Sequence, residues 1–162
     1  MRPLAPDALI ALGSNLGDRA QLLRRAIARL AKLPATELLR ASRFYATHPV
    51  GPPQPDYLNA AVLLRTGLTA HELLQQLLAI ERDAGRVRRE RWGARTLDLD
   101  LILFGETIIA TAELSVPHPR AHERLFVLEP AAEIAPGMRH PILGCTIAQL
   151  LERLRAGEQA PG

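Results

Sequence analysis

Leucine and aspartate alternate strictly from Leu97 to Leu101, and this pattern constrains the fold more than any other feature of the chain. Strict alternation is the period of a β-strand, whose successive side chains point to opposite faces of a sheet. The pattern predicts a strand over 97–104 that turns at Gly105. One face of that strand would carry Leu97, Leu99, Leu101 and Leu103, and the other would carry Asp98 and Asp100.

The two aspartates follow a segment that is rich in arginine, with Arg86, Arg88, Arg89, Arg91 and Arg95 inside ten residues. Neighbouring carboxylates repel each other unless a cation lies between them. A magnesium–polyphosphate site needs acids for the metal and guanidinium groups for the phosphate oxygens, and this segment supplies both. The alternative is a solvated acidic face beside a basic loop, and alternation alone does not decide between the two.

The chain has a net charge of +3, and arginine supplies nearly all of its positive charge because Lys32 is the only lysine. An arginine loop on an α+β core also suits a nucleic-acid-binding module, which is the alternative function. Aromatic residues make up only 4% of the chain, too few for the usual stacking platform. Paired aspartates facing the same cleft would also repel a phosphate backbone. We therefore expect no nucleic acid among the partners.

Composition predicts one globular domain over residues 1–162 and a cytoplasmic location. Hydrophobic residues make up 48% of the chain, yet no apolar run approaches the ~20 residues of a membrane span. The N-terminal apolar run lacks a small-residue cleavage site, so we expect neither a signal peptide nor membrane attachment. Cys145 is the single cysteine, which rules out an internal disulfide and suits a reducing compartment.

The first half of the chain alternates between strands and helices. We expect strands over 7–12, 37–46 and 57–65, and a helix over 18–33. Residues 13–17 form a glycine-rich turn, a weak phosphate-loop signal that reads better as a tight strand-to-helix turn. Four prolines in 47–55 predict a stiff loop that serves as a binding wall. Tyr57 and Asn59 share a strand face and suit a flat heterocycle, although such pairs are commonly just half-buried.

The second half begins with a capping box, Thr69 with Glu72, which opens a helix that we expect to stop at Gly85. Further helices are predicted over 126–134 and 146–154, with a frayed end over 156–162. His118 and His122 have the spacing of a zinc pair. Pro119 places His118 before any helix and no third ligand is evident, so a hydrogen-bonding or cationic rim with Arg120 and Arg124 fits better.

Four blocks of sequence together resemble the 6-hydroxymethyl-7,8-dihydropterin pyrophosphokinases of folate biosynthesis. The blocks are 11–17 (ALGSNLG), 44–61 (FY…DYLNAA), 85–100 (GRVR…RWG.RTLDLD) and 116–126 (VPHPR…F). The resemblance implies an α+β, ferredoxin-like sandwich, a mainly antiparallel sheet with helices packed on it. It also implies transfer of pyrophosphate from ATP to hydroxymethyldihydropterin with release of AMP, assisted by two Mg²⁺ ions. A monomer is expected.

The resemblance also assigns roles to residues of this sequence. The metal ligands would be Asp98 and Asp100, with Arg86 and Arg95 completing the catalytic set. The pterin would be bound by Thr47, Val50, Tyr57, Asn59, Trp92 and Phe126. ATP would be bound by Glu81, Arg88, Arg95, Leu101, Ser115, His118 and Arg124. No residue stands out as a dedicated general base, so we expect positioning and electrostatics to supply most of the rate.

The chain departs from the family pattern at positions where some members carry other residues: His48, Leu78, Glu113 and Pro119. The loops 47–56 and 85–96 are expected to be mobile lids, each about one residue shorter than the longer family version. These departures affect adenosine contacts and loop motion, and they leave the metal pair and the pterin slot intact.

Overall fold

The computed structural model describes residues 6–15, 18–47, 56–88 and 97–159, with the side chains of 86–88 and 158–159 left aside. The elements follow in the order β1 (Asp7–Ser14), α1 (Arg19–Ala31), β2 (Thr36–Ala41), β3 (Tyr45–Thr47), β4 (Tyr57–Thr66), α2 (Ala70–Arg88), β5 (Asp98–Phe104), β6 (Ile109–Ala110), β7 (Ser115–Val116), the 3₁₀ turn η1 (Ala121–Glu123), α3 (Leu125–Ile134) and α4 (Ile147–Gln159).

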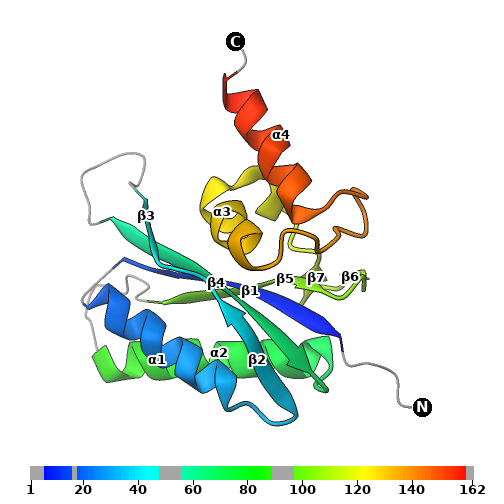
Figure 1. The fold of residues 1–162 in the computed structure, drawn as a ribbon. Coiled ribbons are helices and arrows are strands. Elements are labelled where there is room, and N and C mark those ends of the chain that lie inside the picture. Colours follow the sequence, from blue (N-terminus) through cyan, green and yellow to red (C-terminus); the bar gives the residue numbers. More distant parts are fainter. Residues whose placement is uncertain (1–5, 16–17, 48–55, 89–96, 160–162) are drawn as a thin grey trace.

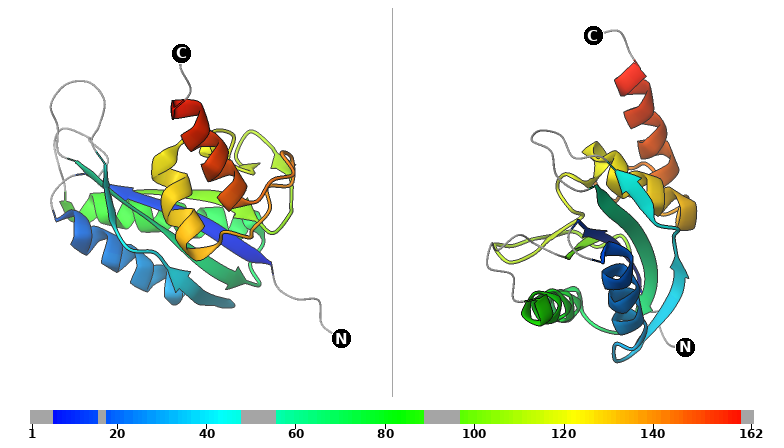
Figure 2. Two further views of the ribbon diagram at one scale, coloured as in Figure 1. Left: turned by 45° about the horizontal axis from the view of Figure 1, so that its top comes forward. Right: turned by 90° about the vertical axis from the view of Figure 1, so that its left-hand side faces the viewer.

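A single antiparallel sheet organises the molecule, with strand order β2–β4–β1–β5 and with β3 paired to β4. Helices α1 and α2 cover one face of this sheet, and α3 and α4 lie on the other (Figure 1). The same layers are visible from two further directions in Figure 2. This arrangement confirms the expected α+β sandwich, and the strand order is that of a ferredoxin-like core. None of the helices in the described ranges is long and apolar enough to cross a membrane.

Each face of the sheet has its own hydrophobic core, because the strands send alternate side chains to opposite sides. Toward α1 and α2, Ile10, Val62 and Leu64 are completely buried together with Leu73 of α2. Toward α3 and α4, Leu9 and Ala61 pack with Leu128. Both faces of the sheet are therefore covered along its middle.

A β-bulge divides β5 and corrects one prediction. Leu9 pairs with Leu103 and Ile10 pairs with Leu101, so Ile102 is an extra residue in the strand. As a result Ile102 and Leu103 both pack in the core beside α3 and α4, whereas Leu101 packs beside α1 and α2. The predicted shared face was right for the leucines at 97, 99 and 101 and wrong for Leu103, because a bulge breaks the alternation.

The strand predicted over 37–46 is interrupted and forms two strands, β2 and β3. At the break, the Ser42 N–H donates to the Ala61 carbonyl over 2.9 Å, and the Ser42 hydroxyl accepts from the Ala61 N–H over 2.9 Å. The hydroxyl thus replaces a backbone acceptor, as serine commonly does in turns. The chain then continues along β4 as β3, which leads to residues 48–55.

The helix starts were predicted well and the helix ends less well. The Asp18 carboxylate accepts from the Gln21 N–H over 3.1 Å, and Thr69 and Glu72 form the reciprocal bonds of a capping box at 2.8 and 3.1 Å. However, α2 continues past Gly85 to residue 88, and α4 continues to residue 159. The expected stop at Gly85 and the frayed end from Ala156 are therefore wrong for the described residues.

Candidate active site

Asp98 and Asn59 are brought together by strand register. Gly13 of β1 is paired with Asn59 on one side and with Asp98 on the other, so all three positions share a row and a face of the sheet. The next row on that face contains Ala61, Ala11 and Asp100. The face is the one on which α3 lies, because Ala11 and Ala61 pack in the core with α3 residues, so the two carboxylates and the amide project from that face.

The small residues in these rows leave room above the sheet. Gly13 lies within β1, which corrects its expected place in a turn. A Cβ atom at this position would lie 3.1 Å from Asn59 Oδ1, tighter than most real contacts. The absence of a side chain at Gly13 therefore keeps the space next to the Asn59 carbonyl oxygen open.

Asn59 is held in a fixed orientation by its neighbour on β3. Its amide nitrogen donates to Thr47 Oγ1 over 2.8 Å, and Thr47 is in turn paired with Tyr57. Asn59 is only 5% exposed, so this hydrogen bond orients the group strongly. Thr47, Tyr57 and Asn59 thus lie together where β3 pairs with β4.

His118 lies between this sheet face and the arginines that follow it. Its backbone N–H donates to the carbonyl of Ile102, the bulged residue, over 2.9 Å. The Nδ1 atom accepts from the Arg120 N–H over 3.2 Å, which leaves Nε2 as the donor of the neutral ring. Burial lowers the pKa of His118, opposed by the nearby Asp100 charge and reinforced by Arg124 and Arg120. The ring is therefore a neutral hydrogen-bond donor near pH 7.

Arg124 and Phe126 lie together at the start of α3. The Arg124 guanidinium carbon is 5.7 Å from the centre of the Phe126 ring, a cation–π distance. Phe126 is 41% exposed although it is a large apolar side chain, so one face of its ring is available to a flat ligand. The pair supplies an aromatic surface and a cation at one place.

A polar cluster that the sequence did not predict ties β3 to α3. Tyr45 donates to Glu133 Oε1 over 2.5 Å, and the Arg43 backbone N–H donates to the same carboxylate over 3.2 Å. Burial and the Glu133 bond raise the pKa of Tyr45, and the Tyr45 bond lowers the pKa of Glu133. Because Tyr45 and Glu133 are 88 residues apart, no local sequence signal indicates this contact.

The structure also describes three further residues with expected ATP contacts: Glu81, Leu101 and Ser115. Glu81 of α2 accepts the Leu99 N–H at Oε2 over 2.7 Å, so its carboxylate reaches the strand between the two aspartates. The Leu101 side chain is buried in the core beside α1 and α2, away from the carboxylate face, so only its backbone is open to a ligand there. Ser115 is exposed on β7, which lies against β5.

The remaining predicted residues lie where the structure gives no side chain. Val50, Trp92 and Arg95 fall outside the described residues, as does His48. Arg86 and Arg88 belong to the last turn of α2, with side chains that are likewise outside the description. Their assignments remain predictions.

The described residues contain no group of three or more His, Cys, Asp or Glu able to hold a metal ion. Asp98 and Asp100 nevertheless fit magnesium, which commonly takes one or two carboxylates and completes its shell with water and substrate phosphates. Both aspartates are half-buried on one sheet face, with the His118 donor and Arg124 nearby. The donor set therefore suits a metal that arrives with a phosphate ligand.

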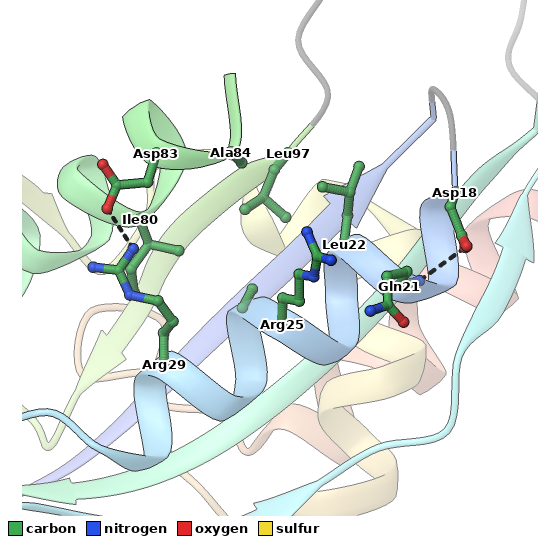
Figure 3. A pocket seen from close by; sticks show the side chains of 10 residues that line it. Asp18, Gln21, Leu22, Arg25, Arg29, Ile80, Asp83, Ala84 and Leu97 are labelled. Carbon is green, nitrogen blue, oxygen red and sulfur yellow. Dashed lines mark hydrogen bonds and ion pairs between the residues drawn. The ribbon is translucent and has the colours of Figure 1, made fainter. Parts of the chain in front are cut away.

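The described residues also line a cavity of about 540 Å³ on the opposite face of the sheet, between α1 and α2. Its floor includes Leu22, Ile80 and Leu97, and an ion pair between Arg29 and Asp83 at 2.5 Å joins the two helices at its side (Figure 3). Leu97 directly precedes Asp98. The cavity thus lies behind the aspartate strand, and it is separate from the carboxylate face.

Comparisons with known proteins agree with this geometry. Residues 9–136 match the family model described as 7,8-dihydro-6-hydroxymethylpterin-pyrophosphokinase. A 2-amino-4-hydroxy-6-hydroxymethyldihydropteridine pyrophosphokinase of Synechocystis sp. is 50% identical, covering 95% of this chain and 83% of its own length. The enzyme of the same name from Bacillus subtilis is 51% identical over 78% of this chain and 77% of its own length.

Solved structures extend the likeness to the fold. A wild-type Plasmodium falciparum HPPK-DHPS crystal structure superposes with a TM-score of 0.74 at 14% identity, covering 96% of this chain. The same comparison covers 46% of the Plasmodium chain, so this chain spans less than half of that protein. At this identity the match concerns the fold alone.

Proposed function

This chain belongs to the 7,8-dihydro-6-hydroxymethylpterin-pyrophosphokinase family and is therefore a pyrophosphokinase of folate biosynthesis, and we propose that its reaction takes place at the carboxylate face of β5. The substrates would be ATP and 6-hydroxymethyl-7,8-dihydropterin, and the products AMP and the pterin diphosphate. The observation that carries the proposal is the register row Asn59–Gly13–Asp98, in which the Asn59 amide and the Asp98 carboxylate lie on one face of the sheet, one on each side of Gly13.

The phosphate side of the site is proposed for the acids of β5 and the cations around them. Asp98 and Asp100 would hold two Mg²⁺ ions, which when bound neutralise charge on the transferred phosphates. His118 would donate from Nε2 to a phosphate oxygen, and Arg124 would contact the phosphates as a cation. We assign the remaining nucleotide and phosphate contacts, as expected from the sequence, to the arginines at 86, 88 and 95, to Ser115 and to the Leu101 backbone.

The pterin side is proposed for the slot between β4 and the start of α3. The Asn59 carbonyl oxygen, open beside Gly13, would accept hydrogen bonds from the pterin edge, and Thr47 would fix that amide. Tyr57 and the exposed Phe126 ring would stack on the two faces of the heterocycle. Val50 and Trp92 are assigned to the same slot from the sequence.

Catalysis at this site would consist of positioning and electrostatic stabilisation. The rows of the sheet hold the Asn59 amide at fixed separations from the Asp98 and Asp100 carboxylates, which supports a site in which the hydroxymethyl oxygen would meet the β-phosphorus. Neutral His118 and the arginines offer donors to the oxygens on which charge increases. We assign no dedicated general base.

The wider context is proposed in the same terms. We infer a single domain over 1–162 that works as a monomer in the cytoplasm. The lids expected at 47–56 and 85–96 lie largely outside the described residues, and residues 85–88 belong to α2. The cluster of Arg43, Tyr45 and Glu133 would hold β3 against α3 and so set the width of the pterin slot.

A product analysis tests the reaction. The purified chain is mixed with ATP, Mg²⁺ and 6-hydroxymethyl-7,8-dihydropterin, and the nucleotide products are separated by ion-exchange chromatography. We expect AMP in equal amount to the pterin diphosphate, with no AMP formed when the pterin is omitted. Formation of ADP would refute transfer of a whole pyrophosphoryl group.

A further inference from the structure

The aspartate strand β5 lies at the edge of the sheet and therefore needs support on its outer side. It pairs with β1 on one side, and among the described residues no second strand forms a hydrogen-bonded ladder with it on the other. An unpaired backbone N–H at a sheet edge is free to shift unless another group accepts it. In β5 that acceptor is the side chain of Glu81, at 2.7 Å from the Leu99 nitrogen.

The position of this hydrogen bond matters because of the peptide unit that it fixes. The Leu99 nitrogen is part of the peptide bond that begins at Asp98, and the Cα atom of Leu99 is followed by the peptide bond to Asp100. Holding this N–H in place therefore fixes the Asp98–Leu99 peptide plane, which adjoins Asp98 and lies one residue before Asp100. Leu99 itself is 5% exposed and packs toward α2, so the anchor acts on a buried point between two half-exposed acids.

The surroundings of Leu97 give β5 less packing support at this end. Leu97 borders the 540 Å³ cavity between α1 and α2 (Figure 3), so part of the space behind the residue before Asp98 is not filled by side chains. Two residues after Glu81, Asp83 forms the ion pair with Arg29 of α1. One turn of α2 thus links β5 to α1 around the cavity through two polar contacts.

We propose that Glu81 is a positioning residue that holds Asp98 and Asp100 in the arrangement required for the metal, by accepting the Leu99 N–H. This inference rests on the proposed function and sharpens it, because it gives Glu81 a role on the strand in place of the expected contact with ATP. What matters in this role is the acceptor oxygen, and the negative charge is not required.

Two substitutions separate the acceptor from the charge. Glu81→Gln keeps a carbonyl oxygen at the end of a side chain of the same length, and Glu81→Met keeps the length and removes the acceptor. The matched control is Glu72→Met, which breaks the capping box at the other end of α2 and lowers helix stability without touching β5.

The first measurement needs neither metal nor turnover. Amide hydrogen exchange followed by NMR in the metal-free protein should show the Leu99 N–H protected in wild type and Glu81→Gln. In Glu81→Met we expect its exchange to be at least tenfold faster, while the neighbouring amides that pair with β1 stay protected. A wild-type Leu99 amide that exchanges like an open one would overturn the inference even if Glu81→Met failed to fold.

The second measurement is Mn²⁺ binding in the presence of α,β-methylene-ATP, followed by calorimetry. We expect Glu81→Met to weaken Mn²⁺ binding at least tenfold, and Glu81→Gln and Glu72→Met to stay within threefold of wild type. Equal losses in the Gln and Met variants would show that the charge is what matters and would reject the positioning role, as would wild-type binding by Glu81→Met. Failure of wild type itself to bind Mn²⁺ with the nucleotide would instead count against the proposed function.

Discussion

The two halves of β5 differ in composition and in what their side chains contact. Asp98 to Leu101 alternates, with two half-buried acids on one face and two leucines buried on the other. From Ile102 to Phe104 all three side chains are buried, at 2%, 1% and 7% exposure, and they are divided between both cores. The bulge at Ile102 is the boundary. One strand can therefore carry polar side chains on a sheet face at one end and pack into both hydrophobic cores at the other.

The largest effect should come from the first half. We expect Asp98→Ala and Asp100→Ala each to lower turnover by about 10³-fold or more, because the proposed metal site would lose one of its two carboxylates. Both acids are half-buried and lie outside the cores, so folding should survive. Steady-state kinetics and thermal melting check the two statements separately. Near-normal turnover in either variant would remove that residue from the metal site.

Substitutions in the second half of β5 should instead lower stability and leave substrate binding nearly unchanged. Leu103→Ala is expected to lower the free energy of unfolding by about 2–5 kcal/mol, since it leaves a cavity beside α3 and α4. Urea denaturation measures this loss, with Ile108→Ala as a control because Ile108 is 58% exposed. The KM values of the folded Leu103→Ala variant should change less than threefold. A large KM change with unaltered stability would erase the distinction between the halves.

A smaller effect tests the row that joins Asp98 to Asn59. In Gly13→Ala the new methyl group would crowd Asn59 Oδ1, and we expect the KM for the pterin to rise about tenfold, equivalent to about 1.4 kcal/mol. The KM for ATP should stay close to wild type. Gly137→Ala is the control, because nothing lies within 4 Å of its added Cβ. A selective rise in the KM for ATP would contradict the assignment of this row to the pterin.

The smallest effect concerns the pKa of His118. Its backbone N–H donates to Ile102 in the second half of β5, and its ring is close enough to Asp100 in the first half to feel that charge. In metal-free protein its pKa should lie below the ordinary value of about 6.5, and Asp100→Asn should lower it further by removing a charge that favours the protonated ring. NMR titration of the ring protons measures both shifts. A rise of the pKa in Asp100→Asn would contradict the arrangement.

The same group has a predictable effect on stability. Because burial lowers the pKa of folded His118, the unfolded chain binds this proton more readily. Its contribution to the free energy of unfolding is therefore complete above pH of about 6.5. That contribution declines as the pH falls from there toward the folded pKa. Comparing wild type with His118→Gln in urea at several pH values isolates this term.

The strand faces near the site were largely predictable from the sequence, because local patterns determine them. Tyr57 and Asn59 share a face as the alternation predicts, and the capping box at Thr69 forms as expected. The face that carries Asp98 and Asp100 was also predicted, since polar and apolar residues alternate there. In each case the residues that determine the structure are neighbours in the sequence.

The rest depended on contacts between distant residues. A bulge among Leu101, Ile102 and Leu103 cannot be seen in a run that is apolar throughout, because either face suits each residue. The break at Ser42 depends on Ala61, and the role of Glu81 depends on a strand that begins well after it. Gly85 carries an intrinsic helix-stop signal, yet the structure continues α2 past it. The sequence thus predicted which strand faces carry the candidate groups and did not predict the long-range contacts that hold them.

The bulge at Ile102 also shapes how the chain can vary. Up to Leu101, tolerance to substitution should alternate: loss of an acid abolishes activity and loss of a leucine abolishes folding. Beyond the bulge this alternation should disappear, because Ile102 and Leu103 are both buried in the same core. The Ile102 carbonyl also accepts a hydrogen bond from the His118 backbone N–H. A complete substitution scan of 97–104 would then show an alternating pattern up to Leu101 and uniform loss of folding after it. The position at which the pattern changes would locate the bulge independently of the structure.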